Sequence, residues 1–358
     1  MDKQPSKYVP VLKWRQGEYQ ALNRLYDSVK DGIIPLVNIP PIEYDFEEKR
    51  LKKTAHEHVQ LFPRRFSAKW GNRPSFIDFD ESLHDEFMDS GASVVSFVFE
   101  ELSALGHNPV PVTGISRSKN YQAVIKTAHK ECGTGMAVRI KLEELMHPEI
   151  SKHISDLIKY HGISFDNIDL IIDLGAPQSF EPYVTFAKAL VKRIKAIARL
   201  DSFRSFILVA TSISISDVKA PGAVMPRHEW SLYKALVERL RDVRLPNYGD
   251  YCIELPGYTS LDMRFVNAAG KIIYTTDDSW FIRKGSAFRG KESQMIQHCK
   301  DVIDSGFYNG KEYSWGDEKI DRTAKGLECS KSRTIWKQVG FSHHITFVTE
   351  QLSTLYGS

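Results

Sequence analysis

The sequence lacks the features that would place it among membrane, secreted or zinc-ribbon proteins. It has no run of about 18 uncharged apolar residues, and its N-terminus lacks the apolar core of a signal peptide. The four cysteines lie far apart and form no CxxC pair, which argues against a zinc ribbon and a disulfide framework. These absences predict a cytoplasmic protein, without membrane association, whose thiols are reduced.

Several motifs of common enzyme classes are also missing. There is no GxGxxG or Walker-type loop, no Gly-x-Ser-x-Gly elbow and no cysteine in a recognisable Cys/His context. Acyl transfer is therefore disfavoured. The formal charge of +3 comes from 48 basic and 45 acidic residues, which is too balanced to indicate nucleic-acid binding. The densest basic run, Lys49-Arg50-Leu51-Lys52-Lys53, is expected to be a solvated helix face.

Strand and helix patterns alternate along the first 258 residues. Some strand candidates, such as 170–172 and 206–210, are almost entirely apolar, as expected for parallel strands covered on both faces. The strand candidates are 8–13, 33–39, 75–79, 109–114, 136–141, 168–174, 205–212 and 250–255. The helix candidates are 18–30, 46–61, 82–105, 118–131, 149–161, 179–199 and 228–242. Eight strands with intervening helices predict an α/β protein with a (β/α)8, TIM-barrel-like fold over residues 1–258.

The pattern changes in residues 259–358. Residues 271–275 and 279–282 look like two strands around a turn at Asp277-Asp278, and helices are expected at 289–305 and 333–355. We expect this appended hairpin and its helices to pack on the barrel rather than to form an independent domain. The adjacent His343 and His344 point about 100° apart on a helix, so packing is favoured over a shared metal.

The carboxyl ends of the strands supply the candidate site, because functional groups of (β/α)8 barrels gather there. Cations at these ends could form an anion-binding pocket, since Arg and Lys both bind phosphate. Glu18 lies one turn after the first strand, and Arg227 follows the seventh. The candidate ligand-binding residues are Lys13, Arg15, Glu18, Arg139, Lys141 and Arg227.

Acidic residues at the strand ends allow two other interpretations. Asp78, Asp173 and Glu254 could pair with the cations in a structural ion network. They could instead be catalytic and hold Mg²⁺, which would activate water against a phosphodiester. Their spacing matches no recognised metal motif, so the metal, if any, is unknown. Asp80 is also a good N-cap for the segment that follows it.

Parts of both ends of the chain resemble a known family. Residues 8–18, followed by Ala21-Leu22, resemble the start of the beta family proteins, a group named for a bacteriophage T4 product. Residues 262–265, 274–285 and 343–348 are also similar to that family. The resemblance implies a setting in phage biology or antiphage defence and supplies no catalytic residue.

Three functions therefore stay open. The leading hypothesis is binding of an anionic, phosphate-bearing ligand, a nucleotide or nucleic-acid end, at the barrel mouth. The second is a metal-dependent phosphodiesterase or nuclease. The third is a non-catalytic scaffold that docks a protein partner through an exposed Trp280 or Phe281 on the 271–285 hairpin.

Overall fold

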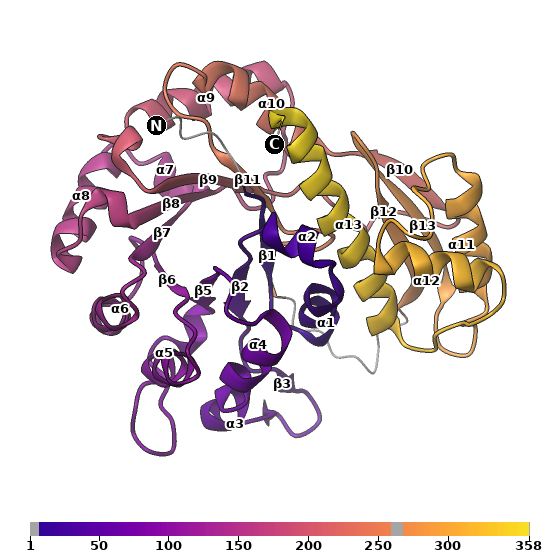
Figure 1. The fold of residues 1–358 in the computed structure, drawn as a ribbon, viewed down its shortest axis with the longest axis horizontal. Coiled ribbons are helices and arrows are strands. Elements are labelled where there is room, and N and C mark those ends of the chain that lie inside the picture. Colours follow the sequence, from indigo (N-terminus) through magenta and orange to yellow (C-terminus); the bar gives the residue numbers. More distant parts are fainter. Residues whose placement is uncertain (1–6, 259–267, 358) are drawn as a thin grey trace.

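Eight parallel strands form a closed barrel in the computed structural model, which describes residues 7–258 and 268–357. The strands are β1 (Val9–Leu12), β2 (Leu36–Ile39), β5 (Phe76–Phe79), β6 (Val110–Thr113), β7 (Met136–Lys141), β8 (Ile168–Asp173), β9 (Ser205–Ala210) and β11 (Asn247–Asp250). Around the barrel their order is β1-β11-β9-β8-β7-β6-β5-β2 (Figure 1). This architecture confirms the predicted TIM-barrel-like fold.

Alternation along the strands separates the barrel interior from its outer layer. Val9 and Val11 lie in the interior core, whereas Leu12 packs in the larger core beneath the helices. The barrel helices are α1 (Gln16–Arg24), α2 (Asp27–Asp31), α3 (Ala55–Val59), α4 (Phe62–Trp70), α5 (Val94–Ala104), α6 (Lys119–Cys132), α7 (Leu142–Leu145), α8 (Ile150–His161), α9 (Tyr183–Lys195) and α10 (His228–Leu240). Short 3-10 turns occur at Glu81–Leu83, Phe165–Asn167 and Leu200–Ser202.

The eighth barrel strand begins and ends earlier than the sequence predicts. The expected strand at 250–255 is wrong, because β11 ends at Asp250. Gly249 is needed inside this strand, since a Cβ there would lie 2.9 Å from the carbonyl oxygen of Val9. The positive φ of Cys252, +52°, then turns the chain away from the barrel. Glu254 therefore lies in a loop rather than at a strand end.

Residues 44–51 form a hairpin where the sequence predicts part of a helix over 46–61. The hairpin consists of β3 (Tyr44–Asp45) and β4 (Arg50–Leu51), and α3 follows it. The Asp45 carboxylate accepts hydrogen bonds from the backbone N–H groups of Glu47, at 2.9 Å, and Glu48, at 3.1 Å. These bonds stabilise a turn at the expense of a helix. Likewise, α5 covers only the last part of the helix expected over 82–105.

The C-terminal part contains a three-stranded antiparallel sheet beside the barrel (Figure 1). The predicted hairpin is present as β12 (Ala269–Thr275) and β13 (Ser279–Ala287). A third strand, β10 (Gly222–Pro226), pairs with β13 and was not predicted. The helices are α11 (Gln294–Asp304), α12 (Trp315–Ala324) and α13 (Arg333–Tyr356), of which α12 was not predicted.

Helix α13 packs against both the barrel and the C-terminal sheet. Trp336 and Val339 belong to the same core cluster as β12, whereas Phe341, Ile345 and Val348 belong to the barrel core. Figure 1 shows the helix between the two parts. Each fully buried side chain of this size contributes about 1.5–3 kcal/mol, so α13 stabilises their contact. Within residues 7–258 and 268–357, no helix has the length and apolar character needed to cross a bilayer.

Candidate functional site

The carboxyl end of the barrel carries a buried layer of charged side chains. Asp78 follows the interior residue Phe76 by two positions, and Arg139 stands in the same relation to Ala137. Side chains two residues apart on a strand share a face, so both charged groups point into the barrel. Asp173 on β8 extends the layer, because it lies two residues after the interior Ile171. Strand register thus brings together three residues predicted at this site.

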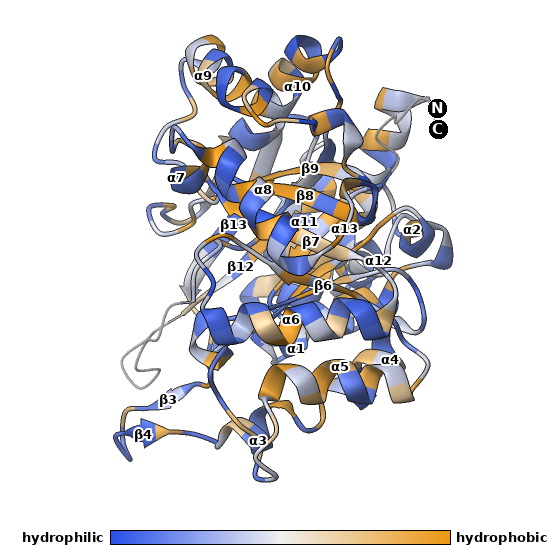
Figure 2. Ribbon diagram, turned by 90° about the vertical axis from the view of Figure 1, so that its left-hand side faces the viewer, coloured by the Kyte–Doolittle hydropathy of each residue, from blue (hydrophilic) through white to orange (hydrophobic). Residues whose placement is uncertain are grey.

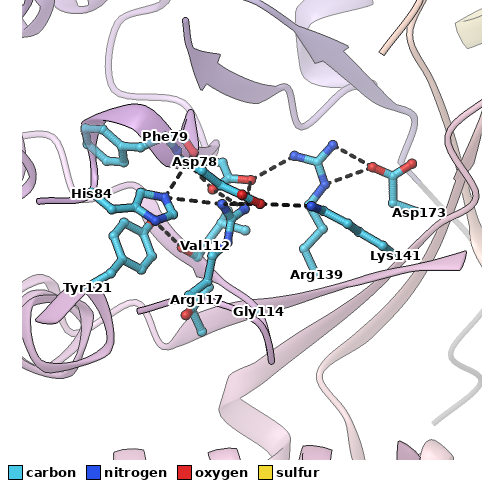
Figure 3. Close-up of polar contacts among 12 residues, drawn as sticks. Asp78, Phe79, His84, Val112, Gly114, Arg117, Tyr121, Arg139, Lys141 and Asp173 are labelled. Atoms are coloured by element: carbon cyan, nitrogen blue, oxygen red, sulfur yellow. Dashed lines mark hydrogen bonds and ion pairs between the residues drawn. The ribbon is translucent and has the colours of Figure 1, made fainter. Parts of the chain in front are cut away.

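Arg139 joins the two aspartates in one ion network (Figure 3). Its Nη1 lies 2.8 Å from Oδ2 of Asp78, and its Nη2 lies 2.5 Å from Oδ2 of Asp173. Arg117 adds contacts from its Nη2 to both oxygens of Asp78, each at 3.0 Å. All four side chains are at least nine-tenths buried. Such buried pairs need good geometry to offset desolvation, and this network supplies it.

The network fixes the charge state of its members. Burial alone would raise the pKa of Asp78, but Arg117 and Arg139 outweigh it and hold this pKa below its ordinary value. Burial acts to lower the pKa of Arg139, but Tyr251, Asp173 and Asp78 outweigh it and raise that pKa. Both groups therefore stay charged and paired near neutral pH. Arg139 is thus already engaged by carboxylates rather than free to bind an anion.

Two members of the network were not among the predicted site residues. The Tyr251 hydroxyl donates to Oδ2 of Asp173 at 2.5 Å and accepts from Nη2 of Arg139 at 2.8 Å. It was missed because the predicted eighth strand was displaced by three residues. Arg117 lies in the loop after β6, and its position at the end of that strand was the signal that could have identified it.

A cavity of about 650 Å³ lies above this layer at the barrel mouth. Among its described lining residues are six carboxylates and three cations. These are Asp78, Asp80, Glu81, Glu143, Glu144 and Asp173, with Arg117, Arg139 and Lys141. Lys141 forms an ion pair with Glu81 at 2.8 Å. The mouth therefore has an excess of negative charge, which does not favour the anion pocket that the sequence led us to expect there.

A larger cleft, of about 1380 Å³, lies beside the mouth between the barrel and the C-terminal sheet with the start of α13. Its described lining includes nine cations and only two carboxylates, Glu43 and Glu254. The cations are Arg15, Lys52, Lys53, Arg65, Lys271, Lys284, Lys331, Arg333 and Lys337. We call this the basic cleft. Among the predicted ligand-binding residues, only Arg15 lines it.

Both carboxylates of the basic cleft are engaged by neighbouring lysines. Glu254 pairs with Lys337 at 2.5 Å, and Glu43 pairs with Lys52 at 2.9 Å. For the other seven cations, no ion pair with a carboxylate is present within the described part of the chain. Burial lowers the pKa of Lys271 and outweighs the opposing effect of Glu254, and the cations Lys337, Lys284 and Arg333 lower this pKa further. The described lining of the cleft therefore carries an excess of positive charge.

Lys13 and Glu18 lie beneath the surface and line neither the mouth nor the cleft. Lys13 Nζ donates to the carbonyl oxygen of Gly257 at 2.5 Å, and the Glu18 carboxylate accepts from the Lys13 backbone N–H. Burial, reinforced by the charge of Glu254, raises the pKa of Glu18 to about 7. These two predicted ligand-binding residues thus support the loop after β1 in the described structure.

Arg227 is fully buried, so its predicted position at the barrel mouth is wrong. Its guanidinium lies 3.3 Å from Oε1 of Glu229 and donates to the carbonyl oxygen of Thr276 at 3.1 Å. A second bond, of 2.9 Å, reaches Oε1 of Gln351 on α13. The reason is that Arg227 directly follows β10, which pairs with β13, so its side chain lies beside the C-terminal sheet and not at the barrel mouth. Trp280 is also fully buried, beside Arg227 and stacked on His344, so it cannot dock a partner.

The predicted metal ligands do not converge. Asp78 and Asp173 are paired with arginines at the barrel mouth, whereas Glu254 lies in the basic cleft. Among the described residues, the group that comes close enough to share an ion is Asp250, Cys252 and His344. Its polar atoms are already hydrogen-bonded: Asp250 accepts from the Tyr8 hydroxyl, the Cys252 N–H and His344 Nε2. This is packing, as the sequence suggested for His344, and we derive no metal chemistry from it.

Comparison with known proteins identifies a family but no activity. The family model described as Beta protein matches residues 8–350. A sequence search of curated proteins finds no match. In structure the chain is similar to a "GH5-4 broad specificity endoglucanase from an uncultured bacterium", with 8% identity and a TM-score of 0.32 over 69% of this chain and 74% of that chain. A likeness at this level says nothing about the site. Residues 262–265, which contributed to the family resemblance, lie outside the described residues.

Proposed function

The chain belongs to the Beta protein family, and from this premise we propose that it binds a phosphate-bearing ligand, a nucleotide or a nucleic-acid end, in the basic cleft. The setting we propose is phage biology or antiphage defence, which the family resemblance implies. The site differs from the barrel-mouth position expected from the sequence. Hydrolysis is not part of the proposal, because Glu254 lies apart from Asp78 and Asp173, and arginines already engage these two aspartates.

One observation carries the proposal: among the described residues that line this single cleft, nine are cations and two are carboxylates. Like charges held this close repel one another, and a bound anion relieves that repulsion. Arg333 offers a planar fork that matches a phosphate, while Lys271 and Lys284 supply point charges deeper in the cleft.

The test is to compare charge removal in the cleft with charge removal at the barrel mouth. The Lys271→Gln/Arg333→Gln double variant removes two cations of the cleft. Lys141→Gln is the matched control, because Lys141 lies at the mouth and is paired with Glu81. Binding of ATP and of pyrophosphate is measured by calorimetry at low salt. We expect the double variant to bind at least about tenfold more weakly, since each charge-assisted bond contributes about 1.5–3 kcal/mol.

The control variant should bind as the wild type does. If Lys141→Gln weakened binding while the double variant did not, the ligand would lie at the barrel mouth and the proposed site would be wrong. Absence of ATP and pyrophosphate binding to the folded wild type would refute the function itself. A circular dichroism melt of each variant confirms that the comparison is made on folded protein.

A further inference from the structure

We propose that the ligand of the basic cleft is a single-stranded nucleic acid, which also covers the hairpin of β3 and β4. We call residues 43–53, which contain this hairpin, the arm. The inference rests on the proposed function, because it names the class of phosphate-bearing ligand. Its support comes from the distribution of the cations, the size of the cleft and the exposed face of the arm.

The cations line both walls of the cleft. The barrel wall contributes Arg15, Lys52, Lys53 and Arg65. The opposite wall, formed by β12, β13 and the start of α13, contributes Lys271, Lys284, Lys331, Arg333 and Lys337. A ligand with one phosphate group can reach few of these charges at once. A chain that carries one phosphate per nucleotide can contact cations from both walls along its length.

The size and depth of the cleft favour a thin, extended ligand. Its volume of about 1380 Å³ exceeds the range of roughly 300–1,000 Å³ that is typical for pockets of single small molecules. Lys271 and Lys284 are half-buried, whereas Lys53 and Arg333 are exposed at the rim. A duplex presents its phosphates on a rigid cylinder and would reach the rim cations first. A single strand can bend inward and reach the deeper lysines as well.

The arm presents apolar side chains on one face. Strand register pairs Tyr44 with Leu51, so these two side chains lie on the same face. The Phe46 ring packs edge-on against the Tyr44 ring, with 5.2 Å between the ring centroids. Their exposed fractions are 39% for Tyr44, 50% for Leu51 and 36% for Phe46. The arm projects from the barrel next to α3 (Figures 1 and 2). Aromatic rings exposed in this way can stack on nucleic-acid bases.

The arm is continuous with the basic cleft. Glu43, Lys52 and Lys53, which flank the two strands, all line the cleft. Glu43 is neutralised by Lys52, and the Asp45 carboxylate binds the turn of the arm. Asp45, Glu47 and Glu48 place carboxylates at the turn of the arm, so we expect the phosphates to follow the cations of the cleft and only the bases to reach the arm. The cleft supplies cations that can contact the phosphates of a nucleic acid, and the arm supplies aromatic rings that can stack on its bases. Proteins that bind single strands with little sequence preference combine the same two features.

Fluorescence anisotropy tests the inference with a labelled oligonucleotide of about 12 nucleotides, offered as single-stranded DNA, single-stranded RNA and duplex DNA. The key variant is Tyr44→Ala/Phe46→Ala. Tyr160→Ala is the matched control, because Tyr160 is similarly exposed, at 45%, on α8 away from the cleft. Stacking lost from one base corresponds to about fivefold weaker binding or more. We therefore expect at least a fivefold loss for the arm variant and no loss for the control.

The same measurements separate this inference from the proposed function. We expect the arm variant to bind ATP and pyrophosphate as the wild type does, and single strands of DNA or RNA to bind the wild type more tightly than duplex. The salt dependence of single-strand binding should indicate three or more phosphate contacts, a log–log slope of about −2 or steeper. Equal binding of duplex and single strands, or an unchanged affinity of the arm variant, would overturn the inference and leave ATP binding intact. If the folded wild type bound neither ATP, pyrophosphate nor any oligonucleotide, the proposed function itself would be refuted.

Discussion

At the scale of single residues, a cation can bind a ligand phosphate well only where no carboxylate already neutralises it. Arg139 lies between Asp78 and Asp173, so its charge is used inside the protein. Lys271 lies near Glu254, but that carboxylate is paired with Lys337, and the other charges that act on Lys271 are cations. The sequence shows both kinds of cation as single letters. Only the positions of the carboxylates distinguish a structural cation from one that can bind a ligand.

Glu18 gives a prediction on pH dependence at this scale. Its pKa is raised from 4.5 to about 7 by burial and by Glu254, so the folded protein binds a proton that the unfolded chain releases. The stability from this proton is complete below pH 4.5 and is lost as the pH rises through 7. At about 1.4 kcal/mol per pKa unit, ionising Glu18 costs roughly 3 kcal/mol. Glu18→Gln stays neutral and keeps an oxygen that can accept the Lys13 N–H. We expect this variant to be more stable than the wild type at pH 8 by about 1–3 kcal/mol.

The measurement is urea unfolding of the wild type and Glu18→Gln at pH 5 and pH 8. At pH 5 the two proteins should differ little, because Glu18 is then protonated in the folded wild type. A variant less stable than the wild type at pH 8 would show that the ionised carboxylate is stabilised by Lys13 and Lys337 more than burial penalises it.

At the scale of elements, strong apolar patterns identified helices and strands better than they identified boundaries. The strands at 136–141 and 168–173 could be predicted closely because each contains an apolar run, Met136–Val138 and Leu170–Ile172, rich in residues that favour strands. The eighth strand, Asn247–Asp250, contains no such run. Its position depends on Gly249 packing closely against Val9, which the sequence pattern does not show. The arm was mistaken for a helix because Asp45 stabilises the turn through two backbone bonds that no periodicity reveals.

The long C-terminal helix provides a test of close packing between elements. Gly340 on α13 faces β12, and a Cβ at this position would lie 3.2 Å from the carbonyl oxygen of Ile273 and 2.7 Å from Cδ1 of Ile253. Gly340→Ala gains about 1 kcal/mol of helix propensity, but overpacking costs about 1–3 kcal/mol. We expect a net loss of stability in chemical unfolding.

Thr354→Ala is the control for this substitution, because Thr354 is exposed near the end of the same helix. It should change the free energy of unfolding by no more than about 0.5 kcal/mol. If Gly340→Ala were as stable as the control or more stable, Ile253 would have moved aside and the helix would not be held closely against β12.

At the scale of the whole molecule, the basic cleft could not be derived from the sequence. Its cations come from the loop after β1, the arm, α4, the C-terminal sheet and the start of α13. Arg15 was selected because it follows a strand directly. Lys271, Lys284 and Arg333 gave no signal, because the rule used, that sites form at barrel strand ends, does not extend to a second sheet. The fold and the family could be predicted because they depend on local patterns and motifs, whereas this cleft depends on tertiary contacts.

The shared helix α13 also predicts how the whole chain unfolds. Phe341, Ile345 and Val348 pack in the barrel core, while Trp336 and Val339 pack in the core of the C-terminal sheet. If either part unfolded alone, α13 would expose apolar side chains at a cost of about 1.5–3 kcal/mol each. Three such residues cost about as much as the 5–15 kcal/mol that stabilises a typical domain.

We therefore expect one cooperative transition, with equal calorimetric and van't Hoff enthalpies. Hydrogen exchange should give the same opening free energy for amides of β8 in the barrel and β13 in the sheet. Ile345→Ala, at a fully buried position, should lower both values together by about 2–5 kcal/mol. Two separate transitions, or a loss confined to the barrel amides, would show that the C-terminal part folds independently of the barrel. The basic cleft would then lie between two units able to move relative to each other, and its affinity for phosphates would depend on that motion.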